Sequence, residues 1–235
     1  MKKNLLRIVC ILMALFMLPV HAFAAEQAAQ EEALTGAAAI NYVQKNADFV
    51  GSEYRTVTTS QNNRLEFRVD TYTKTEPVGL TRSGVTEYKT TTYQIYNRSS
   101  GQQYDDNLDP RGYILFTLTV YHTDFVYNNA NYRRMTSVSG SYTPISPGAE
   151  VASQSYTVAV YGVPYPGGAK TDQATYSLSK TQRSWSASIN SSRFPGMLMG
   201  GLTHYQRVEY NFTLSSTEFN DSWDGYLRVN AYEAL

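Results

Sequence analysis

The stretch that decides the fold is GYILFTLTVYHTDFVYNN, from Gly112 to Asn129. In its first half, apolar residues occupy every second position and mostly polar residues stand between them. The regularly spaced apolar residues are Ile114, Phe116, Leu118 and Val120. This period of two predicts a β-strand with one face in the core, as is typical of antiparallel sheets.

The same one-sided alternation recurs from Glu53 to the end of the sequence. Apolar residues share one parity in 65–69 and again in 208–214. Turn residues rich in Gly, Pro, Asn and Asp separate about ten such segments at the spacing of a sandwich. We therefore predict one all-β domain over 51–235, an antiparallel β-sandwich. A division into two domains near Pro164–Gly168 is the alternative.

The second half of the opening stretch poses a choice. If the alternation continued, His122 and Asp124 would face the core as a buried pair, which could be catalytic. After Asp124, however, Phe125 and Tyr127 carry the apolar pattern with the other parity. Because burying an unpaired carboxylate is costly, we predict a β-bulge around His122–Thr123 that turns Asp124 to solvent and keeps both aromatic rings in the core.

The first 24 residues have the features of a secretory signal peptide. Lys2, Lys3 and Arg7 form a positive n-region, Leu5–Val20 is an apolar run, and Ala22-Phe23-Ala24 is a small-x-small cleavage site. We expect a mature chain from Ala25 that is secreted, extracellular or loosely associated with the wall of a bacterium. Stable membrane insertion is not expected.

Removal of residues 1–24 changes the composition of the mature chain. The single cysteine, Cys10, is lost, so no disulfide or thiolate metal site is expected. The mature chain has 17 basic and 20 acidic residues, a net charge of −3. This balance argues against electrostatic binding of nucleic acid. Residues 25–50 form an Ala-, Gln- and Glu-rich leader, disordered or with a short helix near 36–47.

Three segments within 86–162 carry a family resemblance. KTTTYQIYN is a Thr/Tyr-rich strand, LTVYHTDFVYNN ends in F-x-Y-N-N, and TSVSGSYT is Ser/Thr-rich. In these motifs the chain resembles an uncharacterised family of exported Gram-positive Thr/Ser/Tyr-rich β proteins. The second motif departs from the family pattern by about one residue near His122. The resemblance implies secretion and a β fold, and it implies no activity or functional residues.

A candidate metal site lies in the loop before the opening stretch. Asp105, Asn107 and Asp109 place oxygen donors on alternate residues, the ligand spacing of a calcium loop. An EF-hand would have Gly and Glu where Pro110 and Phe116 stand. We therefore expect at most a weak calcium site and no other cofactor.

The residue inventory for catalysis is small. His122 and His204 are the only histidines after cleavage, and no G-x-S-x-G or H-E-x-x-H motif occurs. A hydrolase needs only two suitably placed carboxylates, for which Glu209, Glu218 and Asp221 are candidates. We predict a protein that is not an enzyme and keep a secreted carboxylate-dependent hydrolase as the alternative.

Aromatic residues in or beside loops are the candidates for binding. These are Tyr161, Tyr165, Trp185 and Trp223. Exposed aromatic rings can stack on sugars, although tryptophan in a sandwich is commonly part of the core. We predict an extracellular binding module for cell-wall polysaccharide or another glycan. A membrane-active hairpin of Tyr132–Tyr142 and Val151–Tyr161 is a further alternative, disfavoured by Arg134 on its apolar face.

Overall fold

The computed structural model describes residues 36–58, 64–81, 84–98, 113–145, 148–200, 204–215 and 223–233. These residues form one α-helix and eleven strands, which pair antiparallel in two sheets. The prediction of an all-β sandwich of about ten strands is confirmed. Within the described part of the chain, no helix has the length and apolar character needed to span a membrane.

The larger sheet has seven strands in the order β1-β2-β3-β4-β5-β8, with β9 also paired to β5. Their bounds are β1 Asp48–Thr58, β2 Arg64–Leu80, β3 Thr86–Arg98, β4 Ile114–Tyr127, β5 Ala130–Pro144, β8 Ser184–Ser188 and β9 Met197–Leu198. The opening stretch is β4, in the middle of this sheet. Asn128 and Asn129 join β4 to β5 with φ of 48° and 59°. Such left-handed residues suit the tight turn of a two-residue hairpin.

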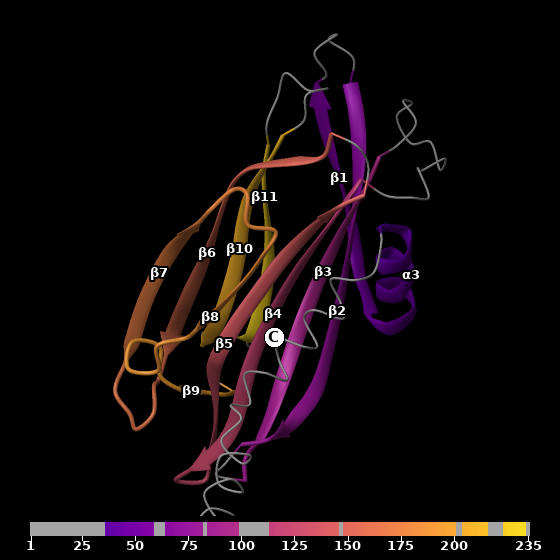
Figure 1. Cartoon of the computed structure of the whole chain (residues 1–235). Helices are drawn as coiled ribbons and strands as arrows, with labels where there is room; N and C mark the ends of the chain where they lie inside the picture. The colour runs from indigo at the N-terminus through magenta and orange to yellow at the C-terminus, as the bar shows by residue number, and fades with distance from the viewer. Residues whose placement is uncertain are drawn as a thin grey trace, which may run out of the picture.

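The smaller sheet has four strands in the order β11-β10-β6-β7. Their bounds are β6 Glu150–Gly162, β7 Lys170–Leu178, β10 Tyr205–Ser215 and β11 Trp223–Glu233. Because β5 and β6 belong to different sheets, they do not form the hairpin considered from the sequence. Figure 1 shows β6, β7, β10 and β11 together on one side of the long strands β2 to β5.

Aromatic rings fill the space between the two sheets. Phe116 of β4 stacks on Phe212 of β10, with 3.7 Å between ring centroids and 10° between planes. Tyr96 and Tyr210 pack edge-on against this pair. Gly225 leaves room for Phe212, since a Cβ there would come within 2.6 Å of the ring. The regular apolar positions of the sequence therefore form the core, as predicted.

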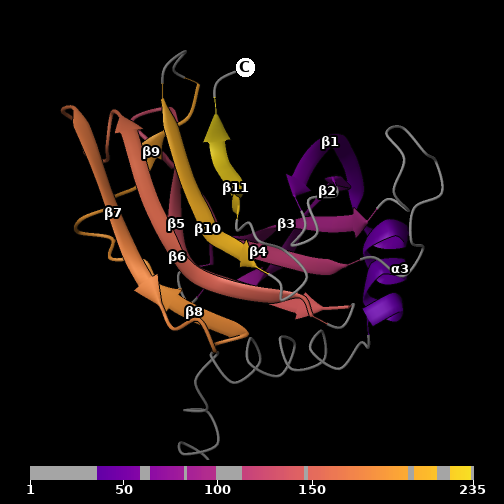
Figure 2. The same cartoon turned by 90° about the horizontal axis from the view of Figure 1, so that it is seen from above.

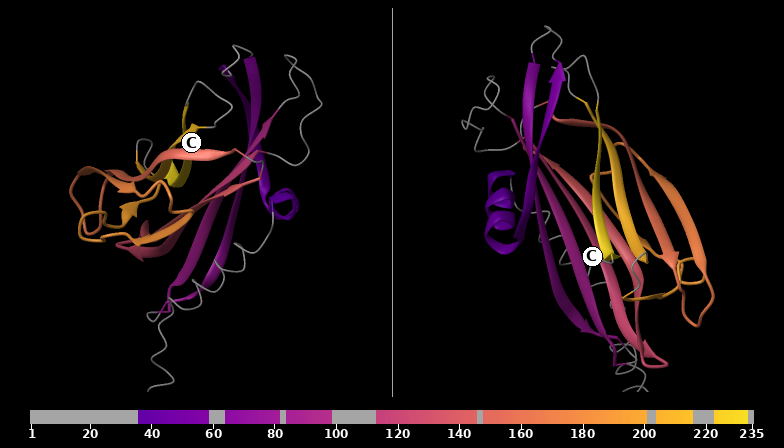
Figure 3. Two further views of the ribbon diagram at one scale, coloured as in Figure 1. Left: turned by 45° about the horizontal axis from the view of Figure 1, so that its top comes forward. Right: turned by 180° about the vertical axis from the view of Figure 1, so that it is seen from behind.

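Helix α3 (Gly36–Asn46) covers the outer face of the larger sheet. Its buried residues Ala39, Ile40 and Val43 pack in one cluster with side chains of β2, β3 and β4. These partners are Tyr72, Tyr93, Ile95 and Leu115. Figures 2 and 3 show the helix on the side of this sheet away from the smaller one. The short helix expected near 36–47 is thus present, and β1 begins before the predicted domain boundary at 51.

Candidate binding face

The outward face of the smaller sheet is defined by the alternation of β10. Val208, Tyr210 and Phe212 point into the core and are buried, so the residues between them point outward. Six of the outward residues of β6, β10 and β11 carry aromatic rings or charges, namely Tyr161, Tyr205, Tyr226, Arg207, Glu209 and Arg228. We call this set the tyrosine face.

Two tyrosines from neighbouring strands lie together at one end of the face. Tyr161 of β6 is the register partner of Tyr205 of β10. Their ring centroids are 5.7 Å apart and their planes differ by 21°. Tyr161 is 40% exposed, and the Arg207 guanidinium carbon lies 4.8 Å from the Tyr205 centroid. The pair therefore presents two nearly parallel rings at the surface, and the Arg207 guanidinium packs against the Tyr205 ring.

Glu209 orders the centre of the face. It accepts a hydrogen bond at Oε1 from Arg228 Nε at 2.9 Å, and Arg228 Nη2 forms an ion pair with the same oxygen at 2.7 Å. Arg207 Nε lies 3.4 Å from the same oxygen. Arg228 in turn lies over Tyr226, with its guanidinium carbon 5.3 Å from the ring centroid. One carboxylate thus accepts a hydrogen bond from Arg228 and forms a longer ion pair with Arg207, and each arginine packs on a tyrosine.

Polar side chains fill the rows between the aromatic rings. Tyr226 is the register partner of Asn211, which stands six residues after Tyr205 on β10. At the usual rise per residue, Tyr226 is about 20 Å along the sheet from Tyr205. Ser155 and Thr157 of β6 lie beside this row, and Asn211 donates a hydrogen bond to Thr157 Oγ1 at 3.3 Å. The face therefore offers two separated aromatic contacts with donors and acceptors between them.

The structure places the four aromatic residues that were candidates for binding in different surroundings. Tyr161 lies on the tyrosine face. Tyr165 is 37% exposed but packs edge-on against Phe125, Tyr127 and Tyr132 at the end of the larger sheet. The side chain of Trp223 lies outside the described residues.

Trp185 is a core residue, so its interpretation as a stacking platform was wrong. Its side chain is 5% exposed and stacks on Tyr156, with centroids 4.7 Å apart. The ring also occupies the space over Gly140, where a Cβ would come within 2.5 Å of it. A ring enclosed on both sides has no face left for a ligand.

Tyr205 and Tyr226 were missed from the sequence because they stand within strands rather than loops. A usable signal was present in HYQRVEYNFTL, where Tyr205 has the parity opposite to Val208 and Phe212. This parity marks an outward side chain. The pairing of Tyr205 with Tyr161 could not be read from the sequence, because it depends on the register between two strands.

The predicted metal ligands and two candidate carboxylates are not placed. Asp105, Asn107 and Asp109, together with Glu218 and Asp221, lie outside the described residues. Over the ranges that are described, no group of three or more His, Asp and Glu side chains is arranged to hold a metal ion. Glu209, the remaining candidate acid, is already engaged by two arginines.

The β-bulge lies in β5 rather than in β4, which corrects the prediction for His122–Thr123. β4 pairs with β3 without interruption, whereas its register with β5 shifts so that Tyr121 opposes Ser137 and His122 opposes Met135. Thr136 is therefore the extra residue. Because β4 keeps its alternation, His122 and Asp124 share the inward side with Val120, and the expectation that Asp124 turns to solvent was wrong.

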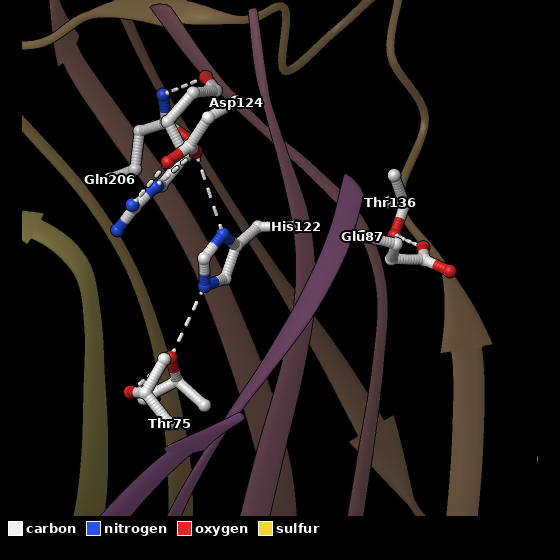
Figure 4. Close-up of polar contacts among 8 residues, drawn as sticks. Thr75, Glu87, His122, Asp124, Thr136 and Gln206 are labelled. Carbon is white, nitrogen blue, oxygen red and sulfur yellow. Dashed lines mark hydrogen bonds and ion pairs between the residues drawn. The ribbon is translucent and has the colours of Figure 1, made fainter. Parts of the chain in front are cut away.

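His122 is fully buried and Asp124 is partly buried. Figure 4 shows the polar contacts of the cluster around them. Asp124 accepts two hydrogen bonds from Arg133, one at each carboxylate oxygen and both 2.6 Å long. Partial burial opposes the charged form, but the hydrogen bonds from Arg133, with a contribution from His122, hold the pKa of Asp124 well below its usual range. Gln206 donates to the Arg133 carbonyl oxygen at 2.6 Å and ties the cluster to β10.

Phe125 and Tyr127, in turn, are not core residues. Both are only partly buried, and Phe125 stacks on Tyr132 with 5.6 Å between centroids. The bulge in β5 explains why Asp124, rather than Phe125 and Tyr127, lies on the inward side of β4. It places Arg133 opposite Asp124, and this partner makes burial of the carboxylate tolerable.

The cluster has the order of a catalytic triad but lacks the geometry of one. Thr90 Oγ1 lies 3.2 Å from His122 Nε2, and His122 Nδ1 lies 3.7 Å from Asp124 Oδ1. The second distance is too long for a hydrogen bond, and Nδ1 has no hydrogen-bond partner. Because His122 is fully buried, a substrate cannot reach it. The arrangement is that of an internal polar contact between strands.

Comparison of the chain with protein-family models, curated proteins and solved structures found no match. The resemblance to exported Gram-positive β proteins therefore stays a prediction.

Proposed function

We propose that this protein is a secreted, non-catalytic binding protein that takes up a cell-wall polysaccharide or another glycan on the tyrosine face. The observation that carries the proposal is the nearly parallel pair Tyr161–Tyr205, in which Tyr161 is exposed and Tyr205 is partly buried. Sugar rings have apolar faces and polar edges, so they suit an aromatic ring with hydrogen-bonding groups around it. The second exposed ring, Tyr226, would allow a polymer to be held at two points.

The rigidity of the face supports this role. Tyr205 and Tyr226 stand on paired strands, and the arginines beside them form ion pairs with Glu209. Side chains that are ordered before binding lose little conformational freedom when a ligand arrives. Export, which the first 24 residues predict, would bring this face into contact with wall polymer outside the cell.

Binding can be tested with the mature chain from Ala25 on a glycan array and with insoluble cell-wall preparations. Tyr161→Ala and Tyr226→Ala should each weaken binding about tenfold, as loss of one aromatic anchor does. Tyr161→Phe keeps the ring and should retain most of the affinity.

The matched control is Tyr54→Ala. Tyr54 is also an exposed tyrosine, 56% exposed, but it stands on β1 of the larger sheet. Its removal should leave glycan binding unchanged. If no glycan or wall fraction binds the mature chain, or if Tyr161→Ala and Tyr226→Ala bind as the unchanged chain does, the proposal fails.

A further inference from the structure

A pocket of about 380 Å³ lies at the far end of the larger sheet, apart from the tyrosine face. It is lined by β4 and β5, by Thr81 and Val85 beside the β2–β3 turn, and by Tyr165. Of its β4 residues, Thr123, Phe125 and Tyr127 point to the side of β4 opposite to His122 and Asp124, and Val126 at the end of the strand completes the lining. Its volume is in the range of small-molecule sites.

Arg134 supplies a positive charge to this pocket. Its Nε is buried and has no hydrogen-bond partner, and the side chain forms no ion pair with any residue that the structure describes. The guanidinium carbon lies 5.0 Å from the Phe125 centroid. A buried N–H group without a partner is costly, and a guanidinium offers a planar fork of donors that matches a carboxylate.

The bulge in β5 directs Arg134 into the pocket. Because Thr136 is the extra residue, Met135 faces the core opposite His122, and Arg134 opposes Thr123. Thr136 itself lines the pocket. Its hydroxyl donates a hydrogen bond to Glu87 Oε1 at 2.9 Å, and Figure 4 shows this contact. Bulges that re-aim a side chain are typical of functional positions.

Aromatic rings form the apolar wall of the pocket. Tyr165 packs edge-on against Phe125 at 5.4 Å and against Tyr127 at 4.8 Å between centroids. These three rings lie at the partly exposed end of the larger sheet and are not part of the core. A flat ring could pack against them while a charged group on that ring reaches Arg134.

We infer that this pocket binds a small, ring-bearing carboxylate, with the carboxylate on Arg134 and the ring against Phe125, Tyr127 and Tyr165. Sugar acids and aromatic acids share this chemistry. The Thr123 hydroxyl, and the Thr136 oxygen as an acceptor, provide polar contacts for the ring substituents of a sugar acid. The inference does not depend on glycan binding at the tyrosine face, where none of these six residues stands.

The test is an NMR titration of the ¹⁵N-labelled mature chain with four probes. Glucuronate and benzoate carry the carboxylate, and glucose and benzamide are their uncharged counterparts. At least one acid should shift the backbone amide resonances of Thr123, Arg134 and Tyr165. It should also bind roughly tenfold more tightly than its uncharged counterpart, because the carboxylate can form charge-assisted hydrogen bonds with the Arg134 guanidinium. Whether glucuronate or benzoate shows this difference identifies the kind of ring.

Variants then assign the contacts. Arg134→Gln should abolish the difference between acid and uncharged counterpart, and Arg134→Lys should keep the charge but weaken binding by loss of the fork. Tyr165→Ala should weaken binding of the ring-bearing acid, whereas any binding of acetate should be unchanged. Arg193→Gln is the control, because Arg193 pairs with Asp172 outside the pocket. Equal binding of acids and uncharged probes, or unchanged acid binding in both Arg134 variants, would overturn the inference.

Discussion

Replacement of Asp124 by Asn is the most direct test of the arrangement at the β4–β5 bulge. The substitution keeps the size of the side chain but removes the charge that accepts two hydrogen bonds from Arg133. Exposed ion pairs contribute about 0–1 kcal/mol to the free energy of unfolding, and breaking a buried pair lowers it by about 3–5 kcal/mol. The Asp124 side chain is 35% exposed and that of Arg133 is 20% exposed, so solvent screens this pair in part. We expect Asp124→Asn to lower the free energy of unfolding by about 2 kcal/mol at pH 7.

The effect should depend on pH in a defined direction. The pKa of Asp124 is lower in the folded protein than the value of about 3.9 expected in the unfolded chain. The charged carboxylate therefore stabilises the fold fully above the unfolded pKa, and this stabilisation is lost as the pH falls through the folded pKa. The difference in unfolding free energy between wild type and Asp124→Asn should shrink steadily below about pH 4.

Urea denaturation at a series of pH values, followed by circular dichroism, measures both effects. Glu53→Gln is the control, because Glu53 pairs with Arg55 at 3.0 Å and both side chains are more than 40% exposed. That control should change the unfolding free energy by less than about 0.5 kcal/mol. A double-mutant cycle with Arg133→Gln should give a coupling energy above about 1 kcal/mol.

Two results would refute this reasoning. A loss smaller than about 0.5 kcal/mol for Asp124→Asn would show that Asp124 behaves as a solvated surface residue. A larger loss that did not change between pH 7 and pH 3 would show that the charge of the carboxylate is not what stabilises the fold.

Three further predictions concern the core, the helix and export. Trp185→Ala should lower the unfolding free energy by about 3–5 kcal/mol. Gly140→Ala should lower it by about 1–3 kcal/mol, because the added Cβ would collide with the Trp185 ring. Thermal and urea denaturation measure both changes. Ile40→Ala should cost about 2–4 kcal/mol if α3 is an integral part of the fold, since Ile40 is 3% exposed against the larger sheet; a change near zero would make the helix dispensable. N-terminal sequencing of exported protein should begin at or within a few residues of Ala25, and recovery of only the full-length chain in the membrane fraction would contradict the predicted signal peptide.

The sequence by itself determined the all-β fold class and the regularly spaced apolar residues of the core. Side chains of a strand point to alternate faces whatever the strand pairs with, so the regular apolar positions of β4 and β10 identified inward residues correctly. The same local periodicity indicated the short helix that became α3. Each of these properties depends on residues close together in the chain.

The tertiary structure alone decided which of the candidate binding residues lie together. Tyr161 and Tyr205 become neighbours only through the register of β6 with β10, and β5 and β6 part into different sheets although they are consecutive in the chain. The position of the bulge likewise depends on a partner strand. The parity of β4 suggested an inserted residue near His122, but the extra residue is Thr136 of β5, and it places Arg133 against Asp124 and Arg134 in the pocket. Periodicity records which face a side chain occupies, whereas strand pairing over long separations in the chain sets which side chains share that face.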